Sequence, residues 1–204
     1  MTSASASRPS NHPLLSGPIL PTLLKLAAPN VLAMTMAVAV GVAETWYIGL
    51  LGTGPLAAMA LVFPFNMLTQ MLSSGAMGGG VSSAVSRALG AGDDARARTL
   101  AFHATVIGTI AGLVYTFLFL TFGPALYAML GGKGQVLADA VAYGGTLFCG
   151  ATLVWLMNAL ASVVRGTGNM RVPSVTILIT SALQIVVGGV LCLGLGPAPS
   201  LGLQ

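Results

Sequence analysis

Glu44 is the residue whose chemistry most needs an explanation, because it lies inside a long apolar stretch, residues 26–52 (LAAPNVLAMTMAVAVGVAETWYIGLLG). In a helix rising about 1.5 Å per residue, Glu44 would lie roughly 12 Å from the turn at Gly52. A carboxylate at that depth in a membrane is costly to desolvate and usually marks a functional site. Glu44 therefore predicts a coupling site for a proton or for Na⁺. The structural alternatives are a protonated Glu44 that only hydrogen-bonds a neighbouring helix and a Glu44 near a locally hydrated outer end of its helix.

Polar residues at helical spacing mark three other apolar stretches, and each set would share one face of a helix. The first set is Asn66, Thr69, Gln70 and Ser73; the second is Trp155, Asn158 and Ser162; the third is Thr176, Thr180, Gln184 and Gly188. Interhelical hydrogen bonding explains any one set taken alone. Three sets beside one carboxylate favour a hydrated cavity, with Asn66, Gln70, Asn158, Thr180 and Gln184 as the candidate lining residues. The amides of Asn158 and Gln184 could bind Na⁺ or a protonated Glu44.

The elements that would position these residues are transmembrane helices. Of the 204 residues, 55% are hydrophobic and 6% are charged, and the mean hydropathy is +0.91. Apolar runs near 26–50, 55–86, 100–122, 136–164 and 173–195 are each long enough to cross a bilayer as a helix. They predict an all-α, polytopic membrane bundle of five visible transmembrane helices. Pro29 and Pro64 are expected to kink the first two helices or to act as hinges.

The basic residues predict the orientation of these helices, because cytoplasmic loops of membrane proteins are enriched in Lys and Arg. With residues 1–24 as a cytoplasmic tail, only Lys133 falls on the outer side, and the inner side carries Arg8, Lys25, Arg87, Arg96, Arg98, Arg165 and Arg171. The tail lacks the apolar core of a signal peptide. We therefore predict a multi-pass protein of the cell membrane (the inner or plasma membrane) with a cytoplasmic N-terminus.

Several function classes are disfavoured by the sequence. The scattered basic residues form no patch for nucleic acid. Lys133 lies in GGKG without the spacing of a phosphate-binding loop, and His12, His103 and the two cysteines lack metal-ligand spacing. We therefore predict no enzymatic activity, no cofactor other than the coupling ion, and no metal site other than Na⁺ at Glu44.

Small residues are spaced for close contact between helices in two places, Gly75-xxx-Gly79 and Gly108-xxx-Gly112. They predict a tightly packed bundle. The glycine-rich segment 75–86 is expected to be a weaker helix than its surroundings.

Three stretches together resemble one family, the multidrug and toxic compound extrusion (MATE) transporters. They are KLAAPNV with GVAETWYIGLLGTGPLAA, SSAVSRALGAGDDARAR, and VVRGTGNMRVPSV. The resemblance runs from about Lys25 onward. It implies that residues 25–204 are the N-terminal lobe of a twelve-helix transporter, with five helices of a six-helix lobe.

The resemblance also implies a function, namely the exchange of H⁺ or Na⁺ for small organic, often cationic, drugs. Glu44 falls where the family carries an acidic residue on its first helix. Many members have an amide and then a second carboxylate on the fifth helix, where this chain has Gln184 and Gly188. The lost carboxylate favours H⁺ over Na⁺ as the coupling ion.

Other functions stay open at this stage. One is a flippase for a lipid-linked substrate, which has a related two-lobe architecture. We expect no Lys or Arg in the membrane interior, which argues against an anionic lipid headgroup. The other is a non-transporting membrane scaffold or fragment. The expected partners are small cationic compounds, the lipid bilayer, and the missing C-terminal lobe or another second lobe.

Overall fold

A computed structural model describes residues 18–193, and within this range the chain forms helices joined by short turns, without a strand. In chain order the elements are α2 (Ile19–Leu51), α3 (Thr53–Gln70), the π-helix η1 (Met71–Met77), α4 (Gly78–Gly90), α5 (Asp94–Met129), α6 (Gly134–Cys149), α7 (Ala151–Gly166) and α8 (Arg171–Leu193). The sequence-based prediction of an all-α membrane bundle is confirmed. Among the described residues four helices are long and apolar enough to cross a membrane, and the bent pair α6–α7 makes a fifth span when it is counted as one.

Most of the helices are longer than the apolar runs that predicted them. Helix α2 begins at Ile19, so the end of the predicted 1–24 tail is helical, whereas residues 1–17 and 194–204 lie outside the described residues. Helix α5 begins six residues before its predicted start near residue 100. The Asp93 carboxylate caps it by accepting a hydrogen bond from the Arg96 backbone N–H at 2.8 Å. An apolar run in the sequence ends at the first charged residue, whereas a helix with a capped N-terminus can include charged residues in its first turns.

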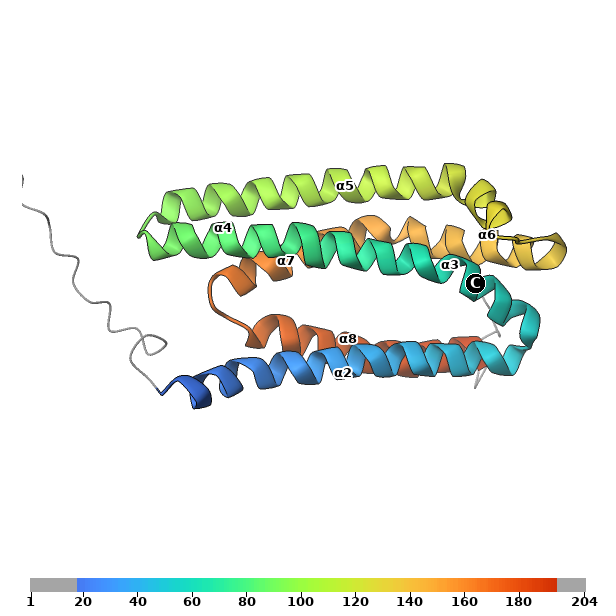
Figure 1. Ribbon diagram of the computed structural model, residues 1–204, viewed down its shortest axis with the longest axis horizontal. Coiled ribbons are helices and arrows are strands. Elements are labelled where there is room, and N and C mark those ends of the chain that lie inside the picture. The colour runs from blue at the N-terminus through green and yellow to red at the C-terminus, as the bar shows by residue number, and fades with distance from the viewer. Residues whose placement is uncertain (1–17, 194–204) are drawn as a thin grey trace, which may run out of the picture.

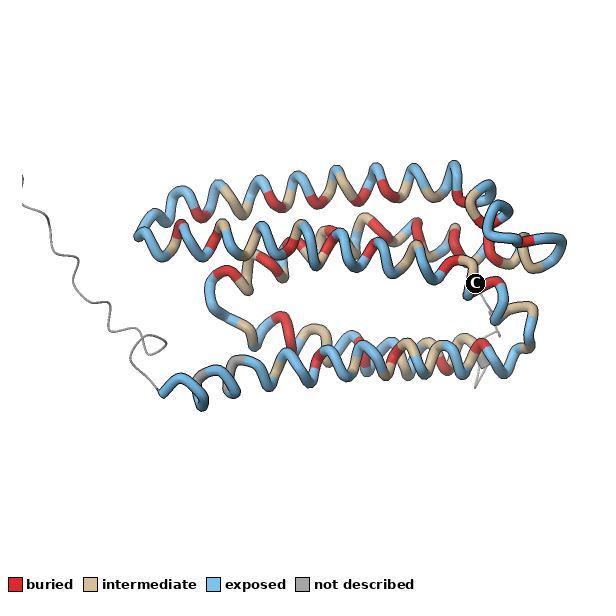
Figure 2. The backbone as a smooth tube through the Cα atoms, in the orientation of Figure 1, coloured by how far each residue is buried: buried red, intermediate tan, exposed pale blue. Residues whose placement is uncertain are grey.

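The helices divide into a pair and a body. Helix α2 lies along α8, while α5 packs on α7 and α6, and α3 and α4 pack on α6 and α7. Figure 1 shows the α2–α8 pair running beside the body formed by α3 to α7. Buried residues follow the inner sides of the body, whereas the pair is largely exposed (Figure 2). The structure therefore has a well-packed body and a more exposed pair of helices beside it.

Glycines bring α5 and α7 into close contact. A Cβ added at Gly112 would lie 2.7 Å from the Thr152 Cα, and one added at Gly108 would lie 3.0 Å from the Ala159 Cβ. Gly75 and Gly79, by contrast, have no such neighbour within 4 Å. Of the two small-residue motifs in the sequence, only Gly108-xxx-Gly112 is therefore used for close helix packing.

Aromatic rings fill the interior of the body. Phe119 stacks on Tyr115 with ring centroids 4.6 Å apart and on Phe148 at 4.5 Å. The Tyr115 hydroxyl donates a hydrogen bond to the Phe65 carbonyl at 2.9 Å, which joins α5 to α3. These contacts hold the body together independently of the α2–α8 pair.

Two irregularities interrupt the long helices of the body. The chain bends by 41° between α6 and α7 at Gly150, where the Thr116 hydroxyl of α5 donates a hydrogen bond to the Phe148 carbonyl at 3.0 Å. The other is the π-helix η1 (Met71–Met77). It overlaps the start of the glycine-rich segment 75–86, which the sequence predicted to be a weaker helix. Pro29 and Pro64 lie inside the continuous helices α2 and α3.

The glycine contacts make a prediction about stability. Gly112→Ala should destabilise the protein by about 1–3 kcal/mol, because the new methyl group meets the backbone of α7, which cannot rotate away. Gly79→Ala, also within a helix, should be neutral or stabilising by up to about 1 kcal/mol, since alanine is the better helix former. Thermal unfolding of the detergent-solubilised protein measures both. Equal shifts for the two variants would contradict the packing described here.

Candidate functional site

A polar cavity of about 480 Å³ lies between the α2–α8 pair and the body. Its walls come from α2, α3, η1, α6, α7 and α8. Its volume falls within the range that holds drug-sized ligands. Two charged side chains line it, Glu44 from α2 and Arg165 from α7.

Glu44 is held by one hydrogen bond that joins the two helices of the pair. The Gln184 amide Nε2 on α8 donates to the Glu44 Oε1 at 2.6 Å. The Glu44 side chain is half-buried, and no other side chain within residues 18–193 donates a hydrogen bond to its carboxylate. One carboxylate oxygen is therefore left for a proton, a cation or a ligand.

Asn158 links the cavity wall to the π-helix. Its Nδ2 donates to the Ser73 Oγ at 2.8 Å and lies 3.4 Å from the Gln70 Oε1. The Ser73 hydroxyl in turn donates to the Thr69 carbonyl at 2.7 Å. A π-bulge leaves some backbone carbonyls without an N–H donor, and a hydroxyl group can donate a hydrogen bond to such a carbonyl instead. Such bulges often occur at functional sites.

Arg165 also lines the cavity, although the sequence assigned it only to a cytoplasmic turn. Its side chain lines the cavity, and its Nη2 donates to the Ser162 Oγ at 2.9 Å. Side chains on a helix lean toward its N-terminus, so this arginine reaches back from the end of α7 toward the cavity. The spacing of Asn158, Ser162 and Arg165 on one helical face was the signal that could have found it.

Four of the five candidate lining residues meet at this cavity together with Glu44: Asn66, Gln70, Asn158 and Gln184. Thr180 does not line it, and its hydroxyl donates to the Thr176 carbonyl of its own helix at 2.9 Å. The face of α8 turned to the cavity is instead that of Ile177, Ser181 and Gln184. Sequence reasoning also missed the lining residues Asn30, Ser74, Tyr143 and Ser181.

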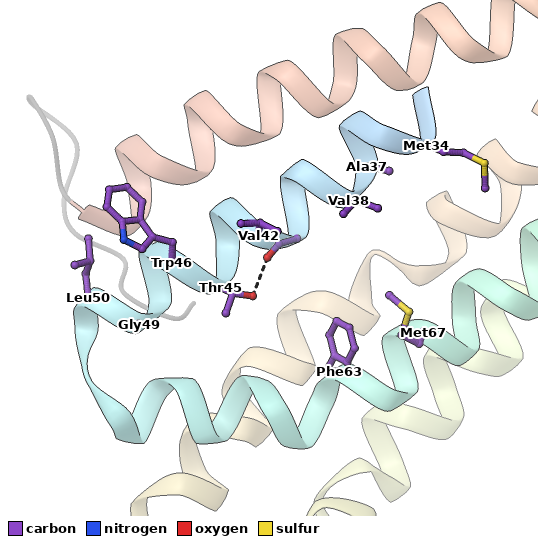
Figure 3. A pocket seen from close by; sticks show the side chains of 11 residues that line it. Met34, Ala37, Val38, Val42, Thr45, Trp46, Gly49, Leu50, Phe63 and Met67 are labelled. Carbon is purple, nitrogen blue, oxygen red and sulfur yellow. Dashed lines mark hydrogen bonds between the residues drawn. The ribbon is translucent and has the colours of Figure 1, made fainter. Parts of the chain in front are cut away.

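A second, larger cavity is an apolar groove of about 1000 Å³ between α2 and α3. Figure 3 shows Trp46 and Leu50 at one end of it and Met34 at the other, with Phe63 and Met67 facing them from α3. None of its lining residues is ionisable, and the Thr45 hydroxyl is occupied by the Gly41 carbonyl at 2.7 Å. The groove adjoins the polar cavity, but the groups that can do chemistry lie in the smaller space.

The donor set at Glu44 is small. Within residues 18–193 no group of three or more His, Cys, Asp or Glu side chains could hold a metal ion. Asp139, a second carboxylate within the predicted fourth run, is bound by the Gln135 amide at 2.8 Å and does not line the cavity. Gly188, one turn after Gln184, contributes no ligand atom from a side chain.

The chain is similar in sequence to known proteins over most of its length. The sequence model of the MatE family matches residues 29–190. The chain is 28% identical over 193 residues to an FAD transporter of Shewanella oneidensis, and 25% identical over 178 residues to the multidrug export protein MepA of Staphylococcus aureus. These alignments cover 95% and 87% of this chain but 42% and 39% of the relatives, so the chain spans less than half of their length.

Solved structures agree with the sequence comparisons. A transporter of the MOP superfamily from Pyrococcus furiosus superimposes with a TM-score of 0.84 at 27% identity, over 97% of this chain and 43% of that one. A multidrug resistance MATE family transporter in an outward-facing conformation gives the same TM-score, identity and coverage. Because the family match extends from the first spanning helix to the last, the chain belongs to the MatE family.

Proposed function

We propose that this chain forms part of a secondary transporter that exports small organic compounds in exchange for a cation, with Glu44 as the coupling group. The observation that carries this proposal is a half-buried carboxylate in a drug-sized cavity, held by a single short hydrogen bond from Gln184. The names of similar proteins support export of small organic compounds, since they include a multidrug export protein and an FAD transporter.

The proposed coupling ion is the proton. Ionised Glu44 accepts a hydrogen bond from the Gln184 amide nitrogen, and protonated Glu44 could donate to the same amide's oxygen after the amide turns over. One carboxylate–amide pair therefore serves both states. A Na⁺ ion would need further oxygen ligands, and the second carboxylate found in many family members is replaced here by Gly188.

Protonation would act through the charge of the cavity. A small organic cation is attracted to ionised Glu44, and binding of a proton at the same carboxylate removes that attraction. Such competition exchanges one ligand for the other, provided that the two bind differently to the inward- and outward-open states. The seam between the α2–α8 pair and the body is where the proposed movement would change access to the cavity.

We propose that the basic end of the bundle faces the cytoplasm. The turns between α4 and α5 and between α7 and α8 lie at the same end in Figure 1, and they are flanked by Arg87, Arg96, Arg98, Arg165 and Arg171. Lys133 lies in the turn between α5 and α6 at the other end. This distribution matches the enrichment of basic residues in cytoplasmic loops.

We propose that a second lobe covers the apolar α2–α3 groove. The exposed side chains of α2 include Val38, Val42 and Trp46, which are 68%, 65% and 64% exposed and line that groove. A surface of this kind must face lipid or protein rather than water. Cysteine crosslinking from Val42 in the intact transporter tests this proposal, because a position that reacts only with lipid-soluble reagents and never crosslinks to protein would contradict it.

The coupling role of Glu44 makes a direct prediction. Glu44→Gln should lower proton-driven efflux at least about tenfold, because the amide cannot exchange a proton. Drug efflux from membrane vesicles that carry the intact transporter, measured with a pH gradient or a Na⁺ gradient, is the assay. Asp139→Asn is the matched control and should leave efflux unchanged, since Asp139 does not line the cavity. Unchanged efflux in Glu44→Gln, or efflux driven by Na⁺ alone, would overturn the proton-coupled proposal.

The hydrogen bond to Glu44 makes a second prediction. Gln184→Leu should lower the efflux rate several-fold, because the carboxylate loses the amide that orients it. Thr180→Val on the same helix should have little effect, since the Thr180 hydroxyl bonds only to its own backbone. Efflux rates of the two variants at equal protein levels decide the matter, and a larger loss for Thr180→Val would refute the assigned geometry.

A further inference from the structure

We propose that Arg165 forms an anion-binding subsite in the cavity of Glu44 and binds a carboxylate or phosphate group of the transported compound. This inference rests on the proposed function, because it takes the polar cavity as the place where that compound binds. It adds a substrate class, namely compounds that carry an anionic group.

The guanidinium of Arg165 is under-used by the protein itself. It has five N–H donors, and within residues 18–193 its one side-chain hydrogen bond goes from Nη2 to the Ser162 Oγ at 2.9 Å. No carboxylate within residues 18–193 forms an ion pair with it. Glu44 is bonded to Gln184, Asp139 to Gln135, and Asp93 to the Arg96 backbone. A half-buried guanidinium with unused donors and no carboxylate partner among the described residues can bind an anionic group of a ligand.

The cavity wall beside Arg165 is made of buried, hydrogen-bonded residues rather than of exposed surface side chains. Ser162 is fully buried, and its hydroxyl donates to the Asn158 carbonyl at 2.7 Å. The Gly78 backbone packs directly against this serine, since an added Cβ would lie 2.5 Å from the Ser162 Oγ. The serine oxygen that accepts from Arg165 is therefore fixed in position, and it holds the guanidinium at the edge of the cavity.

The two charges of the cavity are separated along the bundle. The helical rise of about 1.5 Å per residue puts Gln184, the partner of Glu44, roughly 20 Å along α8 from Arg171 at its start. Arg165 lies just before the turn that leads into α8, and the amides of Asn158 and Gln70 line the cavity too. An elongated compound could therefore place an anionic group at Arg165 and a cationic or apolar part toward Glu44.

Arginine is suited to this role because its planar fork matches the two oxygens of a carboxylate or phosphate. The neighbouring Arg171 provides a contrast. It is exposed and does not line the cavity, although it flanks the same α7–α8 turn. General attraction of anions to the basic end would involve both arginines, whereas the proposed subsite involves only Arg165.

The test uses two dyes that differ in one group, rhodamine B, which has a free carboxylate, and its ethyl ester, which does not. Their equilibrium binding to the purified, detergent-solubilised intact protein is measured by fluorescence polarisation. Arg165→Gln should weaken rhodamine B binding about tenfold and leave the ester within about twofold, as expected for the loss of one charge-assisted contact. Arg171→Gln, the matched control, should change neither dissociation constant.

A second variant keeps the test decisive if Arg165→Gln does not fold. Arg165→Lys keeps the charge but loses the planar guanidinium. Rhodamine B should therefore bind a few-fold more weakly, and the affinity for the ester should not change. If the variants at position 165 weaken the binding of both dyes equally, the proposal is overturned in favour of a structural role. It is also overturned if neither dissociation constant changes. Displacement of rhodamine B, but not of the ester, by added phosphatidylglycerol would overturn the assignment to a transported compound in favour of a lipid headgroup.

This test is separate from that of the proposed function. Dye binding at equilibrium does not depend on coupling, so it reports on Arg165 even if Glu44→Gln leaves efflux unchanged. Conversely, loss of efflux in Glu44→Gln together with unaltered dye preference in Arg165→Gln would keep the coupling role and refute the anion subsite.

Discussion

The hydrogen bond between Gln184 and Glu44 is the contact on which the rest of the site depends. A carboxylate within a spanning helix must be solvated by the protein, and a single amide from α8 does this at 2.6 Å. The bond ties the first described helix to the last across most of the chain. Together with the packing of α8 along α2, it makes the two helices one unit, and the cavity is the space between that unit and the remaining helices.

The body on the other side of the cavity is held by different forces. Gly112 lets α5 approach α7, the rings of Tyr115, Phe119 and Phe148 fill the centre, and the Thr116 hydroxyl bonds to the carbonyl of Phe148 beside the break at Gly150. These are dry, close contacts with little freedom to rearrange. The α2–α8 pair thus lies beside a body whose own contacts do not depend on it.

The cavity combines two opposite charges that do not neutralise each other. Glu44 is bonded to an amide and Arg165 to a serine, so each keeps donor or acceptor capacity for a ligand. A direct ion pair would leave the cavity with little attraction for charged compounds. Both charges therefore remain available to a ligand, and the amides of Asn158 and Gln70 also lie in the cavity wall.

Much of the fold could be predicted from the sequence alone, because the hydrocarbon core of a membrane offers the backbone no hydrogen-bond partners. Only helices satisfy their backbone within an apolar run, so the spans could be predicted from composition, and the same rules single out Glu44 as a candidate site. Helical periodicity likewise grouped Asn66 with Gln70. Periodicity states which residues share a face, but it does not state which way that face turns.

The tertiary structure decided the rest, because neighbouring helices set the rotation of each face. Packing of α8 on α2 turns Ser181 and Gln184 to the cavity and Thr180 away from it. Close contact with α7 is made at Gly108 and Gly112, whereas Gly75 and Gly79 have open space. The continuation of α7 to Gly166 carries the Arg165 side chain back into the cavity from what the sequence presents as a cytoplasmic turn. A charge pattern along the chain cannot show this, because the reach of a long side chain depends on where its helix ends and on what lies opposite.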